Sequence, residues 1–266
     1  MQPMLNIAVR AAREAGKIIT QHFQRIDSLT ISSKAKNDFV SEVDLMAEQA
    51  IIETIRKAYP DHAILAEETG AQGDNEFEWV IDPLDGTTNF LHGFPQFAVS
   101  IALRHKGILT QGVVYDPISQ ELYTASRGSG AMLNDRRIRV ANSRGLEGAL
   151  LGTGFPFRQQ EHLDMYLATF KALFTDTSGI RRPGSAALDL AYVAAGRMDG
   201  FWELGLSQWD MAAGALLILE AGGIVGDFSG GHSYLEKGHI VAGNPKMFKA
   251  ILSTIRPHLT PEFIAP

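Results

Sequence analysis

The sequence contains no cysteine, which excludes disulfides, thiolate metal sites and a cysteine nucleophile. It also lacks a long apolar run, since no stretch approaches the ~18 residues that a membrane span needs. The N-terminal residues lack the apolar core and the cleavage site of a secretory signal. We therefore expect a soluble protein, with the cytoplasm as its default location and no membrane partner.

Positive charge is scarce as well. The chain has 24 Lys and Arg against 30 Asp and Glu, a net charge of -6. General nucleic-acid binding usually needs a basic surface, so we expect no direct nucleic-acid partner. The short basic clusters at 136–139 and 181–182 are interpreted as solvated or loop positions.

The chain shows no linker, repeat or low-complexity tract, and 45% of its 266 residues are apolar. This length and composition predict one compact unit over 1–266, with an N-terminal half of about 1–145 and a C-terminal half of about 146–266.

The first half predicts helices followed by a largely antiparallel sheet. A helix is expected over residues 5–19, and the pattern breaks near 28–33. A second helix begins near Ser41, because Ser41 and Asp44 fit a capping box. Its predicted apolar face consists of Val43, Met46, Ala47, Ala50, Ile51, Thr54 and Ile55. Short strands are predicted at 63–66, 78–81, 97–103, 108–115 and 121–125.

The second half alternates between strands and helices. Strands are predicted at 149–151, 200–204 and 239–242. Helices are predicted at 162–174, 185–195 and 210–221. Residues 152–154 lack a P-loop lysine and are expected to form a loop. The alternation indicates an α+β or α/β protein in which helices cover layers of sheet.

The most informative segment follows the strand at 78–81. Asp82 and Asp85 can converge on one hard cation, with the Leu84 carbonyl as a further oxygen ligand. Gly86 allows a tight turn before a short helix, and the N–H groups of Gly86 and Thr87 can bind a phosphate. The alternative for this acidic pair alone is an ordinary Asp-rich turn.

Two further carboxylates are candidates for the same site. Asp210 opens a helix of small residues, although a first-turn Asp is also favoured by the helix dipole alone. Glu67 ends a strand, where an exposed acidic turn is the alternative. No pair of histidines has zinc-ligand spacing. Oxygen donors alone favour Mg²⁺, with Mn²⁺ as a possible substitute.

These segments resemble the inositol monophosphatase family. Residues 82–88 and 209–214 match its two diagnostic motifs, and Glu67 and Glu68 precede them at the family's spacing. The resemblance covers nearly the whole chain and looks closest to the bacterial SuhB branch, through stretches 4–10 and 184–190. It implies the layered αβαβα sandwich of the inositol monophosphatase and fructose-1,6-bisphosphatase superfamily, usually dimeric and sensitive to Li⁺.

The resemblance also implies a role for each matching residue, with two or three Mg²⁺ ions per site. The first ion would be held by Glu67, Asp82, the Leu84 carbonyl and Thr87. The second would be held by Asp82, Asp85 and Asp210, and Glu67 would help a third through water. The catalytic residues would be Asp44, Glu67 and Thr87, with Asp44 and Thr87 orienting the attacking water. Phosphate and polyol would be bound by Asp85, Gly86, Thr87, Ala186, Glu203 and Asp210.

The implied activity is Mg²⁺-dependent hydrolysis of a small polyol phosphate by metal-activated water, with inositol monophosphate as the leading substrate. Two alternatives remain open. One is a related phosphatase acting on a nucleotide 3′-phosphate, fructose bisphosphate or histidinol phosphate. The other is a regulatory partner of transcription antitermination that contacts NusA in the RNA polymerase complex, with or without catalysis.

Overall fold

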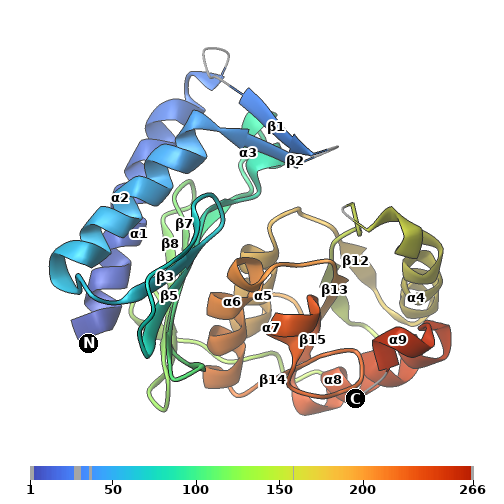
Figure 1. The fold of residues 1–266 in the computed structure, drawn as a ribbon. Helices are drawn as coiled ribbons and strands as arrows, with labels where there is room; N and C mark the ends of the chain where they lie inside the picture. Colours follow the sequence, from blue (N-terminus) through green and yellow to red (C-terminus); the bar gives the residue numbers. More distant parts are fainter. Residues whose placement is uncertain (1–2, 27–30, 36–37, 158, 265–266) are drawn as a thin grey trace.

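The computed structural model describes residues 3–26, 31–35, 38–157 and 159–264. An eight-stranded sheet dominates the first half (Figure 1). Its strands lie in the order β10-β9-β8-β7-β6-β5-β3-β4. Only β3 and β5 pair in parallel, which confirms the largely antiparallel sheet. The strands are β3 (Ala63–Ala66), β4 (Gly70–Gln72), β5 (Phe77–Asp85), β6 (Ala98–His105), β7 (Ile108–Asp116), β8 (Glu121–Ser126), β9 (Gly130–Leu133) and β10 (Arg136–Arg137).

Two long helices, α1 (Pro3–Phe23) and α2 (Glu42–Ala58), cover one face of this sheet (Figure 1). They bury small and aliphatic side chains such as Ala12 and Ile51 against Trp79 and Val99 of the sheet. The capping box predicted at Ser41 and Asp44 is present. Part of the predicted break near 28–33 lies outside the described residues. From Ile31 the chain forms β1 (Ile31–Ala35), which pairs antiparallel with β2 (Asp38–Ser41).

The second half contains a five-stranded sheet in the order β12-β11-β13-β15-β14. Its strands are β11 (Leu150–Thr153), β12 (Gly179–Arg181), β13 (Gly200–Leu204), β14 (Ile224–Gly226) and β15 (His239–Gly243). Helices α4 (Leu163–Asp176) and α8 (Pro245–Ile255) pack on its outer face around a core that includes Trp202 and Ile251. The remaining short helices are α3 (Thr87–Leu91), α7 (Tyr234–Lys237), α9 (Pro261–Ile264), η2 (Gln160–His162) and η3 (Arg256–His258).

Helices α5 (Ala186–Ala194) and α6 (Gln208–Glu220) form the layer between the two sheets (Figure 1). Their side chains join both sheets in one core, from Val80 and Val114 on one side to Phe201 and Ile240 on the other. The order of layers is therefore α1/α2, sheet, α5/α6, sheet, α4/α8. This confirms the predicted αβαβα sandwich.

Small residues bring the middle layer into close contact with its neighbours. A Cβ atom added to Gly214 of α6 would lie 2.5 Å from Cβ of Leu190 on α5. On the sheet side, a Cβ added to Gly112 of β7 would lie 3.1 Å from the carbonyl oxygen of Ala213. The stretch of small residues at 212–215 is therefore explained by packing against a helix and a sheet.

Three local predictions were wrong. Met46 was placed on the apolar face of α2 but is 42% exposed. Asp44 and Glu48 take the buried positions instead, and Glu48 can do so because it accepts hydrogen bonds from the backbone N–H groups of Glu68 and Thr69. Residues up to Thr153 belong to β11 rather than to a loop. Strand β5 continues to Asp85 instead of ending before Asp82.

No helix within the described ranges is long and apolar enough to cross a membrane.

We predict that Gly214→Ala destabilises the protein by about 1–2 kcal/mol, because overpacking against Leu190 outweighs the ~1 kcal/mol gain in helix propensity. Urea unfolding measures the difference. Leu219→Ala, at a 40% exposed position of the same helix, is the control and should stay within about 0.5 kcal/mol of wild type. Stabilisation by Gly214→Ala would mean that the contact between α5 and α6 is looser than described.

Candidate active site

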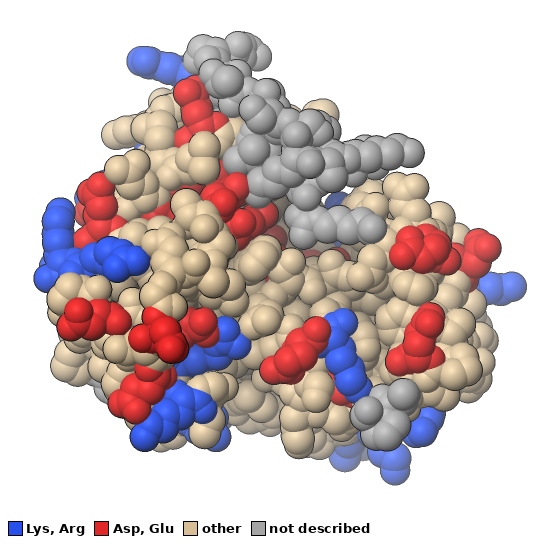
Figure 2. Space-filling view, viewed as in Figure 1, with Lys and Arg blue, Asp and Glu red and all other residues tan. Residues whose placement is uncertain are grey.

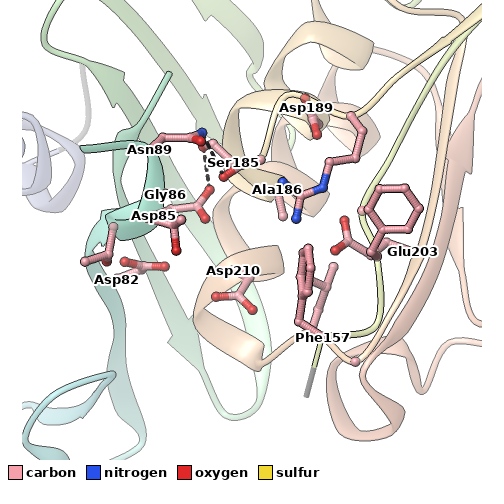
Figure 3. A pocket seen from close by; sticks show the side chains of 18 of the residues that line it. Asp82, Asp85, Gly86, Asn89, Phe157, Ser185, Ala186, Asp189, Glu203 and Asp210 are labelled. Atoms are coloured by element: carbon pink, nitrogen blue, oxygen red, sulfur yellow. Dashed lines mark hydrogen bonds between the residues drawn. The ribbon is translucent and has the colours of Figure 1, made fainter. Parts of the chain in front are cut away.

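A cavity of about 560 Å³ opens where β5, α3 and the first turns of α5 and α6 meet. Its opposite wall includes Glu203 of β13 and Gly154, which directly follows β11. Figure 3 shows Asp82, Asp85 and Asp210 directed toward one another, with Glu203 and Phe157 on the other side of the cavity. The cavity therefore has an acidic end and a distal wall, which we define as Gly154, Phe155, Phe157, Arg182, Asp189 and Glu203.

The end of β5 supplies the first two carboxylates. The pairing between β5 and β6 shifts register between Asp82 and Asp85, so both carboxylates reach the cavity. Asp82 Oδ1 accepts a hydrogen bond from Leu84 N at 2.9 Å. Asp85 Oδ2 accepts from Ser185 Oγ at 2.6 Å and from Ala187 N at 2.7 Å. These bonds fix one oxygen of each group.

The third carboxylate comes from the first turn of α6. Asp210 forms a capping box with Ser207 and accepts a hydrogen bond from Ser207 N at 2.7 Å. Asp82, Asp85 and Asp210 each place an oxygen so that all three lie within 4.8 Å of one another. Glu67 lines the same cavity from the turn after β3. The four acidic residues predicted from distant segments are thus brought together.

A hydrogen-bonded group lies behind this cluster. The Thr87 hydroxyl is 2.8 Å from Asp44 Oδ1 and 3.1 Å from the Leu84 carbonyl oxygen, and it can donate to either. Asp44 is fully buried and also accepts from Ser41 N and Ser41 Oγ. The predicted partnership of Asp44 with Thr87 is present in the structure.

Gly86 connects this group to α3. It is the N-cap of α3, as the sequence predicted for this turn, and has a φ of 102°, which glycine adopts without strain. A Cβ there would also lie 2.9 Å from the Gln96 carbonyl oxygen. Gly86 and Thr87 both line the cavity.

The acidic end is electrostatically unfavourable without a cation. Burial raises the pKa of Asp82 well above its usual value, and Glu67, Asp85 and Asp210 raise it further. Desolvation also raises the pKa of Asp85, to about 6, against the opposing hydrogen bonds from Ser185 and Ala187. On the face drawn in Figure 2, Lys and Arg lie mostly toward the rim, whereas Asp and Glu also occur nearer the centre.

The donor set fits a hard divalent cation. All candidate ligands are oxygens, namely the carboxylates of Glu67, Asp82, Asp85 and Asp210, the Leu84 carbonyl and the Thr87 hydroxyl. Oxygen ligands of this kind suit Mg²⁺ or Mn²⁺. A bound cation would also relieve the repulsion that raises these pKa values.

Two residues that the resemblance assigned to the polyol pocket line the cavity. Ala186 begins α5, and Glu203 of β13 belongs to the distal wall. Burial raises the pKa of Glu203, and the positive charge of Arg182 opposes this shift.

Sequence reasoning missed several residues here. Arg182 was interpreted as a solvated or loop position, and it is an exposed loop residue. Its place at the cavity was missed: it lines the cavity, and its guanidinium lies 4.7 Å from the ring centre of Phe157. Asp189 is buried, and its Oδ1 has no hydrogen-bond partner among the described residues. The role of Ser185 in holding Asp85 was also missed, although a Ser before a helical pattern is a usual N-cap signal.

The chain is similar in sequence and fold to several known proteins. The model of the inositol monophosphatase family matches residues 1–260. A relative from Pseudomonas aeruginosa called Nus factor SuhB is 62% identical over 267 residues, covering 98% of this chain and 98% of the relative. The solved structure of extragenic suppressor protein suhB from Bartonella henselae is 45% identical with a TM-score of 0.94, covering 97% of this chain and 100% of that one. The inositol monophosphatase from Anabaena (Nostoc) is 41% identical with a TM-score of 0.85, covering 97% of this chain and 96% of its own.

We predict that Asp82→Asn raises the melting temperature of the metal-free protein, because the amide keeps an acceptor for Leu84 N while removing a buried like charge. A shift of about 2–4 °C is expected for each kcal/mol gained. Mg²⁺ should then stabilise the wild type more than Asp82→Asn. Calorimetry with EDTA or MgCl₂ measures both effects.

The pH dependence has a definite sign. A carboxyl whose folded pKa is raised stabilises the metal-free fold below its unfolded value of 3.8, and this contribution is lost as the pH rises through about 6 for Asp85. The Mg²⁺-induced rise should therefore be larger at pH 8 than at pH 5. Asp74→Asn, at an exposed position, should behave like wild type. An equal Mg²⁺ response in Asp82→Asn would show that the cation binds elsewhere.

Proposed function

The chain belongs to the inositol monophosphatase family, and we propose that it is a Mg²⁺-dependent phosphomonoesterase that releases phosphate from inositol monophosphate. The observation that carries this proposal is the convergence of Asp82, Asp85 and Asp210 within 4.8 Å in a cavity with a polar distal wall. A homodimer, sensitivity to Li⁺ and a cytoplasmic location belong to the same proposal.

The acidic end would hold the cations. Glu67, Asp82, the Leu84 carbonyl and Thr87 would bind the first Mg²⁺, and Asp82, Asp85 and Asp210 the second, while Glu67 would help a third through water. Bound Mg²⁺ supplies charge neutralisation of the phosphoryl oxygens and a lower pKa for water. The buried position of Asp82 and the fixed oxygens of Asp85 and Asp210 keep this arrangement in place before substrate arrives.

The chain's own groups orient the reacting molecules. When the Thr87 hydroxyl donates a hydrogen bond to Asp44, its lone pairs can accept a hydrogen bond from the attacking water and align it. The N–H groups of Gly86 and Thr87 bind phosphate oxygens at the start of α3. Asp210 positions a second water that protonates the leaving alkoxide. Hydrolysis is direct and forms no phospho-enzyme.

Polyol recognition is assigned to Asp85, Ala186, Glu203 and Asp210. Carboxylates accept hydrogen bonds from hydroxyl groups, and a site built around such bonds discriminates strongly against substrates that lack them. Inositol monophosphate carries a free hydroxyl on each of its five other ring carbons and is the leading substrate, with fructose bisphosphate, histidinol phosphate and nucleotide 3′-phosphates as the alternatives.

We predict that Asp82→Asn lowers phosphate release from inositol 1-phosphate by at least about 10²-fold, because one preorganised anionic ligand is lost. The assay compares inositol 1-phosphate with the alternative esters in the presence of Mg²⁺, EDTA or Li⁺. Asp74→Asn is the matched control and should retain wild-type turnover. Activity of Asp82→Asn within tenfold of wild type, or turnover in EDTA, would contradict the mechanism.

A second function is favoured by the relative called Nus factor SuhB, which is 62% identical to this chain. We infer that the chain also binds NusA as part of a transcription antitermination complex. Such binding requires an exposed surface, whereas the Asp82 side chain is 1% exposed. The two functions are therefore separable in principle.

We predict that purified NusA captures wild-type chain and Asp82→Asn equally well in a pull-down. Asp82 is buried, so its amide variant leaves the molecular surface unchanged. An unrelated protein of similar net charge on the same resin is the control. Failure of both chains to bind NusA would exclude this second function, whereas loss of binding in Asp82→Asn alone would tie it to the metal site.

A further inference from the structure

The carboxylate of Glu203 in the distal wall lies directly against the backbone of Gly154. Strands β11 and β13 are parallel neighbours, with Thr153 opposite Trp202. The residues that follow these two, Gly154 and Glu203, therefore lie side by side. A Cβ atom added to Gly154 would overlap the Glu203 carboxylate at both oxygens and at Cδ. The two residues therefore cannot keep these positions if residue 154 carries a side chain.

Backbone strain does not explain the glycine at this position. Gly154 is not one of the residues with a positive φ, so an L-amino acid could adopt its backbone conformation. The space that the missing Cβ leaves is filled by the Glu203 carboxylate. What requires glycine here is the room for this carboxylate.

Within the described residues, the position of Glu203 is set by its steric contact with Gly154, and no hydrogen bond from a described donor reaches its carboxylate. Both Glu203 and Gly154 line the cavity. Arg182, which rests on the Phe157 ring, is the positive charge that acts on Glu203. Because Glu203 lines the cavity, its acceptor oxygens can contact a ligand bound there.

We propose that Gly154 is a positioning residue, which seats the Glu203 carboxylate where it accepts hydrogen bonds from the hydroxyl groups of a polyol phosphate. This inference rests on the proposed function and extends it to the choice of substrate. Displacing this carboxylate lowers kcat/KM for esters that carry hydroxyl groups near the distal wall. An aryl phosphate such as 4-nitrophenyl phosphate has no such hydroxyl and can donate no hydrogen bond to Glu203.

The test compares Gly154→Ala with Gly145→Ala. Gly145 also has no positive φ, and a Cβ there would meet nothing within 4 Å, so it is a matched control for the same substitution. For each protein, kcat/KM is measured with Mg²⁺ on inositol 1-phosphate and on 4-nitrophenyl phosphate. Gly154→Ala should lower the ratio of the two values about tenfold or more, the scale of one lost hydrogen bond to a charged group. Gly145→Ala should leave the ratio unchanged.

Two further measurements separate positioning from a general structural role. In a Glu203→Ala background, Gly154→Ala should have no additional effect on the ratio, because the carboxylate that it displaces is gone. A crystal structure of Gly154→Ala should show the Glu203 carboxylate moved from its seat, whether or not the crystal contains metal.

Three results would overturn the inference. They are an unchanged ratio in Gly154→Ala, an equal loss on both esters, or an effect that persists without Glu203. If wild-type protein turns over neither ester with Mg²⁺, the proposed function falls and this inference falls with it. That outcome is distinct, because it is seen before any variant is compared.

Discussion

The structure depends on keeping several carboxylates close together in a partly buried cavity. Such groups repel one another and lose solvation, as the raised pKa values of Asp82 and Asp85 show. The fold offsets this cost by fixing one oxygen of each group with donors from its own scaffold, such as Leu84 N and Ser207 N. A cation bound by these carboxylates would offset their repulsion and lost solvation. The fold thus holds in place an acidic cluster that is electrostatically unfavourable on its own.

This anchoring requires the two halves of the chain to meet accurately. Asp85 lies at the end of the first sheet, yet its hydrogen-bond donors, Ser185 and Ala187, belong to the start of α5 in the second half. Asp210 starts α6 in the same layer. The close contact between Gly214 and Leu190 fixes these two helices against each other. The apolar contact between Gly214 and Leu190 thus determines how Asp210 lies relative to the residues that hold Asp85.

The sequence was sufficient for the parts of the site with a local pattern. Asp82 and Asp85 come after an apolar run in the sequence, and a capping box marks the first turn of α2, so these residues could be singled out from spacing alone, although both Asp82 and Asp85 lie within β5. The layered fold came mainly from the family resemblance. The sequence could not show that Arg182 turns toward the cavity, or that Ser185 donates to Asp85, because both depend on contacts between residues far apart in the chain. The prediction for Met46 was wrong because an acidic residue of α2, Glu48, can be buried when backbone N–H groups satisfy its carboxylate.

The two ends of the cavity are constrained in different ways. At the acidic end, Asp82, Asp85 and Asp210 each accept a hydrogen bond from a backbone N–H group, so a change of residue alters both charge and geometry. At the distal wall, Glu203 is positioned by steric contact with Gly154, and Arg182 is positioned by a cation–π contact with Phe157. Packing of this kind can change with single substitutions without disturbing the cation ligands. Substrate choice can therefore vary between proteins with this fold while the acidic end stays the same. The distal wall, rather than the acidic cluster, is the part of this chain that carries information about which phosphate ester it accepts.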